Sequence, residues 1–464
     1  MCPLDAVVGG ATSYLADAAL LGDEVVARVR IDIGPDGSIA ALGRNAEPDG
    51  AVEHLPGLVV PGIANLHSHS FQRAMAGLAE RAGPQGDTFW RWREVMYRFL
   101  AALGPEDVQA IAAQSYAEGL LHGYTSVGEF HYLHNAPDGS PYADPAELAL
   151  RIAAAAEAAG VGLRLLPVLY RQGGFGGAPP TDGQRRFVLD RDAYARLCTD
   201  MARLLPVGVA PHSLRAVGPE ELRFAVALAD ALAPATPLHI HLAEQEREVA
   251  DCLAWSGARP VEWLLDHAAV GPRWCAVHAT HLTGAELARL AASGAVAGLC
   301  QTTEANLGDG IFPLRHWLDH GGRFGIGTDS NVSASPIEEL RWLEYVRRLE
   351  RRARNVSETV PGASVAAGLL RRAAAGGAQA LGRASGSIAV GQLADLLVLD
   401  PEHPALLGRQ GVALLDAWVF SGNATPVRHV MVGGAWVVRH GAHLRGPQIA
   451  AAFARSMRRL ADGL

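Results

Sequence analysis

Residues 58–69 form an apolar run that ends in two histidines: Leu58-Val59-Val60-Pro61-Gly62-Ile63-Ala64-Asn65-Leu66-His67-Ser68-His69. The apolar residues predict a buried β-strand, and both histidines lie at its carboxyl end. Alternate side chains of a strand point to the same side. His67 and His69 can therefore reach one metal ion together.

Seven further apolar runs follow, with helical patterns between them. The expected strands cover residues 58–69, 125–130, 162–169, 207–213, 237–244, 275–282, 296–303 and 323–329. The Ala-rich segments 105–121 and 145–159 carry apolar residues at three- and four-residue spacing, which is typical of helices. Strands that alternate with helices predict an α/β fold with a parallel sheet, and eight such units predict a (β/α)8 TIM-like barrel. The active site of such a barrel lies at the carboxyl ends of the strands.

The sequence pattern at both ends of the chain differs from the pattern in the middle. Residues 1–57 and 386–445 contain short apolar stretches broken by Gly and Asp, such as Arg30-Ile31-Asp32-Ile33-Gly34. We expect these two segments to build one small β-sandwich domain from both chain termini. The barrel then covers residues 58–385, and residues 446–464 form a C-terminal helix.

The amino-acid composition excludes several classes of protein. The chain has 464 residues, 49% of them hydrophobic and 19% charged, which is typical of a globular protein with a large core. A net charge of −8 gives no basic surface for nucleic acid, and no apolar run is long enough to span a membrane. The start of the chain shows no secretory signal, and five scattered cysteines form no disulfide framework, so we expect a cytoplasmic protein.

The sequence contains no lysine, because all 40 residues counted as Lys and Arg are arginine. Schiff-base chemistry and phosphate-binding P-loops both need a lysine and are excluded. A binuclear metal site bridged by a carboxylated lysine is excluded for the same reason.

Further candidate metal ligands follow later apolar runs. We expect His67, His69, His241 and Asp329 to bind one divalent metal, zinc, because nitrogen and oxygen ligands with a position left open for water suit this ion. The same ligands also accept iron and manganese. His239 shares the strand face of His241 and is its rival, although Glu244, three residues after His241, favours His241. Asp329 could instead cap a following helix.

Catalytic roles follow from the chemistry of such a site. Zinc lowers the pKa of a bound water toward neutrality and creates hydroxide. We expect Asp329 to accept a proton from that water and Glu244 to protonate a substrate nitrogen. His278 can hydrogen-bond the hydroxide or the developing tetrahedral centre.

These residues resemble the amidohydrolase superfamily and, within it, the branch of mononuclear deaminases. The stretch G-S-I-x-x-G-x-x-A-D-L-x-V-x-D at 386–400 is also typical of the superfamily. Five segments resemble the N-formimidoyl-L-glutamate deiminase family more narrowly: residues 67–78, 89–94, 128–132, 211–217 and 302–310.

The resemblance implies hydrolysis of the formimino group of N-formimidoyl-L-glutamate to N-formyl-L-glutamate and ammonia, a step of histidine degradation. It implies zinc on the four ligands named above, with Glu244 and His278 catalytic. It also implies that the substrate contacts Gln72, Arg93, Tyr132, His212 and Arg215.

The chemistry of that small anionic substrate agrees with these residues. It carries two carboxylates, and a chain of net charge −8 needs local cations to hold them. Arg93 and Arg215 are suitable, because a guanidinium meets a carboxylate through two hydrogen bonds. Tyr132 and Gln72 can donate further hydrogen bonds.

Three other functions stay open at this point. A related deaminase would act on a purine, pyrimidine or s-triazine ring and would need stacking aromatic side chains. An amidase-like hydrolase of N-acyl amino acids would release a carboxylate in place of ammonia. A catalytically silent scaffold would interact with other proteins. Barrels of this kind are often dimers, so we also expect a homodimer.

Overall fold

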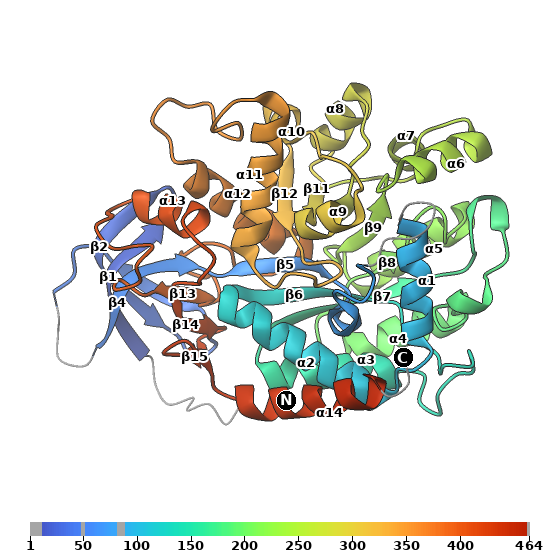
Figure 1. The fold of residues 1–464 in the computed structure, drawn as a ribbon, viewed down its shortest axis with the longest axis horizontal. Coiled ribbons are helices and arrows are strands. Elements are labelled where there is room, and N and C mark those ends of the chain that lie inside the picture. Colours follow the sequence, from blue (N-terminus) through green and yellow to red (C-terminus); the bar gives the residue numbers. More distant parts are fainter. Residues whose placement is uncertain (1–11, 48–51, 81–88, 462–464) are drawn as a thin grey trace.

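A closed parallel barrel forms the centre of the molecule (Figure 1). The computed structural model describes residues 12–47, 52–80 and 89–461. Eight strands pair in the order β8-β7-β6-β5-β12-β11-β10-β9. They are β5 (Ile63–Ser68), β6 (Tyr124–His131), β7 (Gly162–Leu169), β8 (Ala210–Pro211), β9 (Leu238–Leu242), β10 (Trp274–His278), β11 (Val296–Leu299) and β12 (Arg323–Ile326). Parallel bridges from Val209 to Leu238 and from Ser213 to His241 join β8 to β9 and close the sheet, which confirms the predicted barrel.

Helices cover the outside of the barrel. The two predicted helices are confirmed as α2 (Pro105–His122) and α3 (Glu147–Ala159). Pro105 begins α2 in the first turn, where its missing N–H costs nothing, and Gly123 ends α2 in the left-handed conformation at φ 112°. The others are α1 (Phe89–Leu100), α4 (Arg191–Ala202), α5 (Pro219–Leu232), α6 (Glu246–Ser256), α7 (Pro260–His267), α8 (Gly284–Ala292), α9 (Gln301–Leu307), α10 (Leu314–Asp319), α11 (Pro336–Arg351) and α12 (Val365–Leu381). Short 3-10 helices cover Ser70–Met75, Phe175–Gly177 and Asp182–Gln184.

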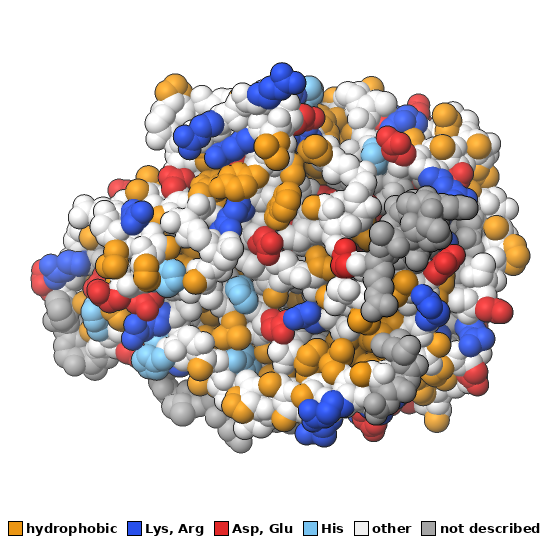
Figure 2. Space-filling view, viewed as in Figure 1, with side chains coloured by type: hydrophobic (Ala, Val, Ile, Leu, Met, Phe, Trp, Pro, Cys, Tyr) orange, Lys and Arg blue, Asp and Glu red, His pale blue; other side chains and the backbone are white. Residues whose placement is uncertain are grey.

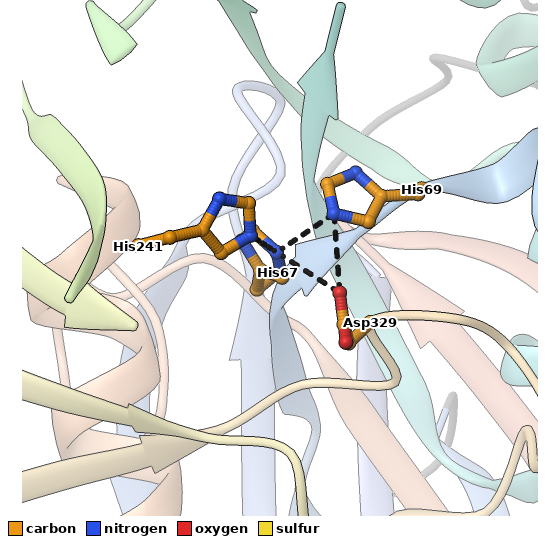
Figure 3. Close-up of side chains that lie close together, drawn as sticks. All are labelled: His67, His69, His241 and Asp329. Atoms are coloured by element: carbon orange, nitrogen blue, oxygen red, sulfur yellow. Dashed lines mark hydrogen bonds and ion pairs between the residues drawn. The ribbon is translucent and has the colours of Figure 1, made fainter. Parts of the chain in front are cut away.

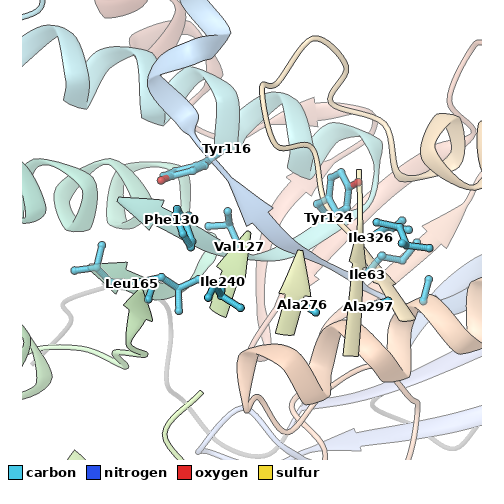
Figure 4. Close-up of a cluster of buried hydrophobic side chains, with 14 of the residues drawn as sticks. Ile63, Tyr116, Tyr124, Val127, Phe130, Leu165, Ile240, Ala276, Ala297 and Ile326 are labelled. Atoms are coloured by element: carbon cyan, nitrogen blue, oxygen red, sulfur yellow. The ribbon is translucent and has the colours of Figure 1, made fainter. Parts of the chain in front are cut away.

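Apolar side chains of the strands fill the core, as Figure 4 shows for Val127 of β6, Leu165 of β7 and Ile240 of β9. Each of these three side chains is at most 2% exposed. The core extends up to the carboxyl ends of the strands, where the ring of Phe130 lies 4.5 Å from the ring of His241. The candidate ligands therefore stand on a rigid, close-packed base.

A second sheet of eight strands is built from both chain ends, in the order β16-β15-β14-β13-β4-β1-β2-β3. Its strands are β1 (Thr12–Leu21), β2 (Glu24–Ile33), β3 (Ile39–Gly43), β4 (Glu53–Pro61), β13 (Leu396–Leu399), β14 (Val427–Val432), β15 (Ala435–Arg439) and β16 (Ala442–His443). The sheet folds over its own buried core, since Trp436 of β15 donates a hydrogen bond of 3.1 Å to the hydroxyl of Tyr14 of β1. The predicted sandwich from both termini is thereby confirmed. Residues 1–11 and 48–51 of the predicted N-terminal part lie outside the described residues.

The predicted first barrel strand, residues 58–69, is in fact two strands. β4 ends at Pro61 and lies in the terminal sheet, between β1 and β13, whereas β5 starts at Ile63 and lies in the barrel. Gly62 separates them, and a Cβ at this position would lie 2.3 Å from the side chain of Thr125. The chain therefore passes from one sheet to the other at Gly62, and not at the predicted boundary between residues 57 and 58.

Several predicted strands also extend beyond the observed ends. The strands predicted at 237–244, 275–282, 296–303 and 323–329 end at Leu242, His278, Leu299 and Ile326. The backbone turns into the left-handed region at Ala243 (φ 52°), His278 (φ 68°) and Asp329 (φ 46°), which ends the strand geometry. The strand predicted at 207–213 is reduced to the two residues of β8 and its neighbouring bridges.

The last helix, α14 (Gly446–Ala461), packs along α2, where Arg459 forms an ion pair with Asp107. It lies within the segment 446–464 in which we expect a C-terminal helix, and residues 462–464 lie outside the described part. A further helix, α13 (Ala413–Phe420), interrupts the C-terminal strands. Acidic and basic side chains are interspersed on the face shown in Figure 2. Among the described helices, none combines the length and apolarity needed to cross a bilayer.

Candidate active site

Four buried side chains meet at the carboxyl end of the barrel (Figure 3). His67 and His69 come from the end of β5, His241 from β9, and Asp329 follows β12. The Oδ1 atom of Asp329 lies 3.2 Å from Nε2 of His67 and 3.1 Å from Nε2 of His69. The Nε2 atom of His67 lies 3.0 Å from that of His241. The structure thus brings together the four predicted metal ligands, none of them more than 5% exposed.

The hydrogen bonds of these histidines fit a bound cation. Nδ1 of His69 donates to the carbonyl of Phe130 at 3.0 Å, and Nδ1 of His241 donates to that of His212 at 3.1 Å. Both Nε2 atoms then carry lone pairs that point inward. Burial lowers the pKa of His67 to about 3, so this imidazole is neutral near pH 7. Converging lone pairs and a carboxylate repel one another unless a cation lies between them, and so the residues fit a divalent metal.

The rival ligand His239 lies elsewhere. Its side chain shares the strand face of His241, but the two positions are about 6.6 Å apart along the strand. Nε2 of His239 donates a hydrogen bond of 2.8 Å to the carbonyl of Ala380 near the end of α12. His239 therefore lies one layer deeper in the barrel and helps to fix α12.

The predicted catalytic residues Glu244 and His278 adjoin the metal ligands. Nε2 of His278 lies 3.8 Å from Oε1 of Glu244, and Nδ1 of His278 lies 3.3 Å from Oε1 of Glu304. Burial by itself lowers the pKa of His278, because it disfavours the charged imidazole. The nearby carboxylates have a larger combined effect in the opposite direction and raise this pKa to about 10. His278 is thus a protonated hydrogen-bond donor near pH 7, with one N–H directed to Glu304 and the other toward Glu244.

Glu244 is a buried carboxyl group suited to proton transfer. Burial raises its pKa, although the positive charges of His278 and Arg215 partly oppose this. Nη2 of Arg215 lies 3.7 Å from Oε2 of Glu244. A carboxyl group whose pKa is raised can both accept and return a proton.

One pocket joins these groups to the predicted substrate residues. Gln72 donates a hydrogen bond of 2.8 Å to the hydroxyl of Tyr132. The guanidinium of Arg93, on α1, lies 5.7 Å from the ring centre of Tyr97. The ring of His212 lies 4.9 Å from that of His241. The pocket is lined by His69, Gln72, Trp92, Arg93, Met96, Tyr97, Tyr132, Tyr170, Phe187, His212, Arg215, His241, Glu244, His278, Leu307 and Asp329.

Three buried carboxylates near the site were not singled out from the sequence. The carboxylate of Glu304 lies 3.3 Å from Nδ1 of His278, and that of Glu248 lies 3.8 Å from Nε of Arg215. The carboxylate of Asp309 lies beside Glu244 and His278. Burial and the charge of Glu244 raise the pKa of Asp309 to about 9. A sequence signal existed only for Glu304 and Asp309, which lie within the segment 302–310. Glu248, on an amphipathic helix, has the pattern of an ordinary surface residue.

The sequence profile of the amidohydrolase family matches residues 58–437 of this chain. The chain belongs to this family. The amidohydrolase is 52% identical to the formimidoylglutamate deiminase of Pseudomonas aeruginosa, over 97% of this chain and 100% of that relative. The resemblance inferred from the five short segments is thereby confirmed.

Solved structures agree with this assignment. An amidohydrolase from Brucella melitensis matches with a TM-score of 0.91 and 46% identity, over 97% of this chain and 100% of that one. An adenosine deaminase from Xanthomonas campestris with bound zinc matches with a TM-score of 0.80, over 97% of this chain and 98% of its own. At 22% identity, the second match concerns the fold alone.

Proposed function

We propose that this amidohydrolase is a hydrolytic deiminase that converts N-formimidoyl-L-glutamate and water into N-formyl-L-glutamate and ammonia. The observation that carries the proposal is one pocket lined by Arg93, Arg215, Glu244 and His278 next to the four metal ligands. The proposal is supported by the relative that is 52% identical over its whole length and is named for this activity.

The arginines account for the anionic part of the substrate. Arg215 and Arg93 line the same pocket as the acid and base groups, so they can bind carboxylates while the formimino group faces Glu244. The pair of Gln72 and Tyr132 adds hydrogen-bond donors to the lining of the same pocket. His212 is the fifth proposed contact, beside the ligand His241.

We propose zinc as the metal held by His67, His69, His241 and Asp329. When bound, such an ion supplies a Lewis acid and a water molecule of lowered pKa. The proposal is supported by the three imidazoles and one carboxylate that converge there, a donor set that suits zinc.

The chain's own residues then move the protons. Asp329 accepts a proton from the water that attacks the formimino carbon, and His278 donates a hydrogen bond to the developing tetrahedral centre. Glu244 delivers one proton to the terminal nitrogen as the water attacks, and Asp329 passes the proton of the water to the same nitrogen, so that the bond between carbon and this nitrogen breaks and ammonia leaves. The hydroxyl proton of the tetrahedral centre then returns to Glu244 and leaves the formyl group, so that one water is consumed for each ammonia released.

The test is ammonia release by metal-loaded enzyme from N-formimidoyl-L-glutamate, with guanine and cytosine as ring substrates and N-formyl-L-glutamate as an amide. We expect ammonia from N-formimidoyl-L-glutamate alone. Release from guanine or cytosine in its place would move the assignment to the ring deaminases. Glutamate and formate from N-formyl-L-glutamate would point to an amidase.

A further inference from the structure

Arg215 lies between two buried carboxylates without a short contact to either. Its Nη2 is 3.7 Å from Oε2 of Glu244, and its Nε is 3.8 Å from Oε2 of Glu248. Direct charge-assisted hydrogen bonds are shorter, about 2.7–2.9 Å. The Nε atom is buried and makes no hydrogen bond within the described structure. The guanidinium is therefore nearly balanced between two anions.

The two carboxylates differ in how firmly they are held. Oε1 of Glu248 accepts the N–H of Ala243 and Oε2 accepts the N–H of Glu244, both at 3.2 Å. These bonds fasten Glu248 to the left-handed turn at Ala243 (φ 52°), a conformation that costs energy for a residue other than glycine. The carboxylate of Glu244 is held only loosely by its charged neighbours, at 3.7 Å from Arg215 and 3.8 Å from His278.

We propose that Glu248 is a positioning residue that keeps Arg215 from pairing directly with Glu244. The guanidinium then stays available to a substrate carboxylate, and Glu244 stays able to carry a proton. This inference rests on the proposed function, which gives carboxylate binding to Arg215 and proton transfer to Glu244.

Electrostatics favours this role. Burial disfavours the charged guanidinium, but the carboxylates of Glu248 and Glu244 keep the pKa of Arg215 above its usual value. Without the charge of Glu248, the nearest anion is Glu244, and a shift of about 1 Å would bring the two groups into a direct pair. Such a pair is strong in a buried pocket and would compete with the substrate for the same guanidinium.

A double-mutant cycle on binding tests the proposal. The probe is the product N-formyl-L-glutamate, titrated calorimetrically into metal-loaded, full-length enzyme. The four proteins are wild type, Glu248→Gln, Glu244→Gln and the double variant. We expect Glu248→Gln to weaken binding about 10-fold in the wild-type background and by less than about 3-fold in the Glu244→Gln background, because no competing carboxylate remains there.

A matched control removes a buried carboxylate elsewhere. Glu286 accepts the N–H of Thr283 at 2.8 Å and pairs with Arg259 at 2.8 Å, on the outer helix α8. Glu286→Gln should leave product binding unchanged. If Glu248→Gln does not give folded protein, Glu248→Asp is used in the same cycle, since it withdraws the carboxylate by one methylene.

The outcomes separate the possible failures. Equal losses in both backgrounds, or no loss from Glu248→Gln, would overturn the role of Glu248 and leave the proposed function standing. A wild-type enzyme that neither binds N-formyl-L-glutamate nor releases ammonia from the substrate would overturn the proposed function, and this inference with it.

Discussion

His239 and His241 are two positions apart on the same strand, yet they have different roles in the structure. Both side chains face the same way, but only His241 reaches the level of the other ligands, whereas His239 donates to the carbonyl of Ala380. The sequence predicts their shared face. It could not fix their depth, because depth depends on where the barrel ends relative to each strand.

We expect His241→Ala to lose the metal and His239→Ala to retain it. The second variant leaves the carbonyl of Ala380 without its donor, and so it should be destabilised by about 1–3 kcal/mol. Elemental analysis of the purified variants and denaturant unfolding measure the two effects. Full metal occupancy in His241→Ala would show that this residue is not a ligand.

Glu244→Gln should keep the metal and lower kcat by a factor of about 100–10,000, which is typical for removal of a general acid–base group. Glutamine has nearly the same shape but cannot carry the proton. Steady-state ammonia release and metal analysis on the same preparation provide the measurement. A variant with wild-type turnover would remove Glu244 from the proton path.

At the scale of the element, the strand ends carry the chemistry. The sequence predicts the strand positions because each strand is an apolar run, but it predicts several of the strands too long. The residues just beyond Leu242 and Ile326 are still apolar or small, and so the pattern does not reveal the left-handed turns at Ala243 and Asp329. Side-chain contacts such as that of Glu248 with the N–H of Ala243 hold these turns, and the apolar pattern of the strand does not include them.

A buried histidine ties β7 to the loop that follows β6. Nε2 of His134 donates a hydrogen bond of 2.9 Å to the carbonyl of Val168, and burial lowers the pKa of His134 to about 4. The unfolded chain binds a proton near pH 6.5, while the folded state stays neutral there. Stability from this residue is thus complete above pH 6.5 and is lost as the pH falls toward 4, by about 2 kcal/mol at pH 5.

We therefore expect His134→Gln to lose less stability than wild type between pH 7.5 and pH 5. Glutamine can still donate an N–H toward Val168 but does not titrate. Free energies of unfolding in urea at both pH values measure the difference. If the free energy of unfolding falls by the same amount in both proteins between pH 7.5 and pH 5, His134 does not contribute to the pH dependence of stability.

At the scale of the whole molecule, the predicted order of strands and helices was sufficient for the barrel and for the sandwich from both termini. The division of residues 58–69 between two sheets was not predictable. Apolar residues continue from one half of the run into the other, since the end of β4 is buried in the terminal sheet and β5 is buried in the barrel. Only the partners of each strand, β13 for one and β12 for the other, distinguish the two halves.

Removal of the metal should destabilise the whole barrel, because the ligands come from three distant parts of the chain. For a metal present at 1,000 times its dissociation constant, the loss is about 4 kcal/mol. Thermal unfolding with and without a chelator should show a Tm lower by several degrees in the metal-free protein. Restored zinc should recover the original Tm. An unchanged Tm would mean that the ligand cluster holds no metal.

The place of β4 between β1 and β13 also has a consequence for synthesis on the ribosome. β4 leads through Gly62 directly into the strand that carries His67, yet its partner β13 begins at Leu396, more than 300 residues later. A nascent chain can therefore assemble the barrel while one edge of β4 still lacks its neighbour. Unpaired edges invite association between chains, so a pause late in translation would expose this protein most.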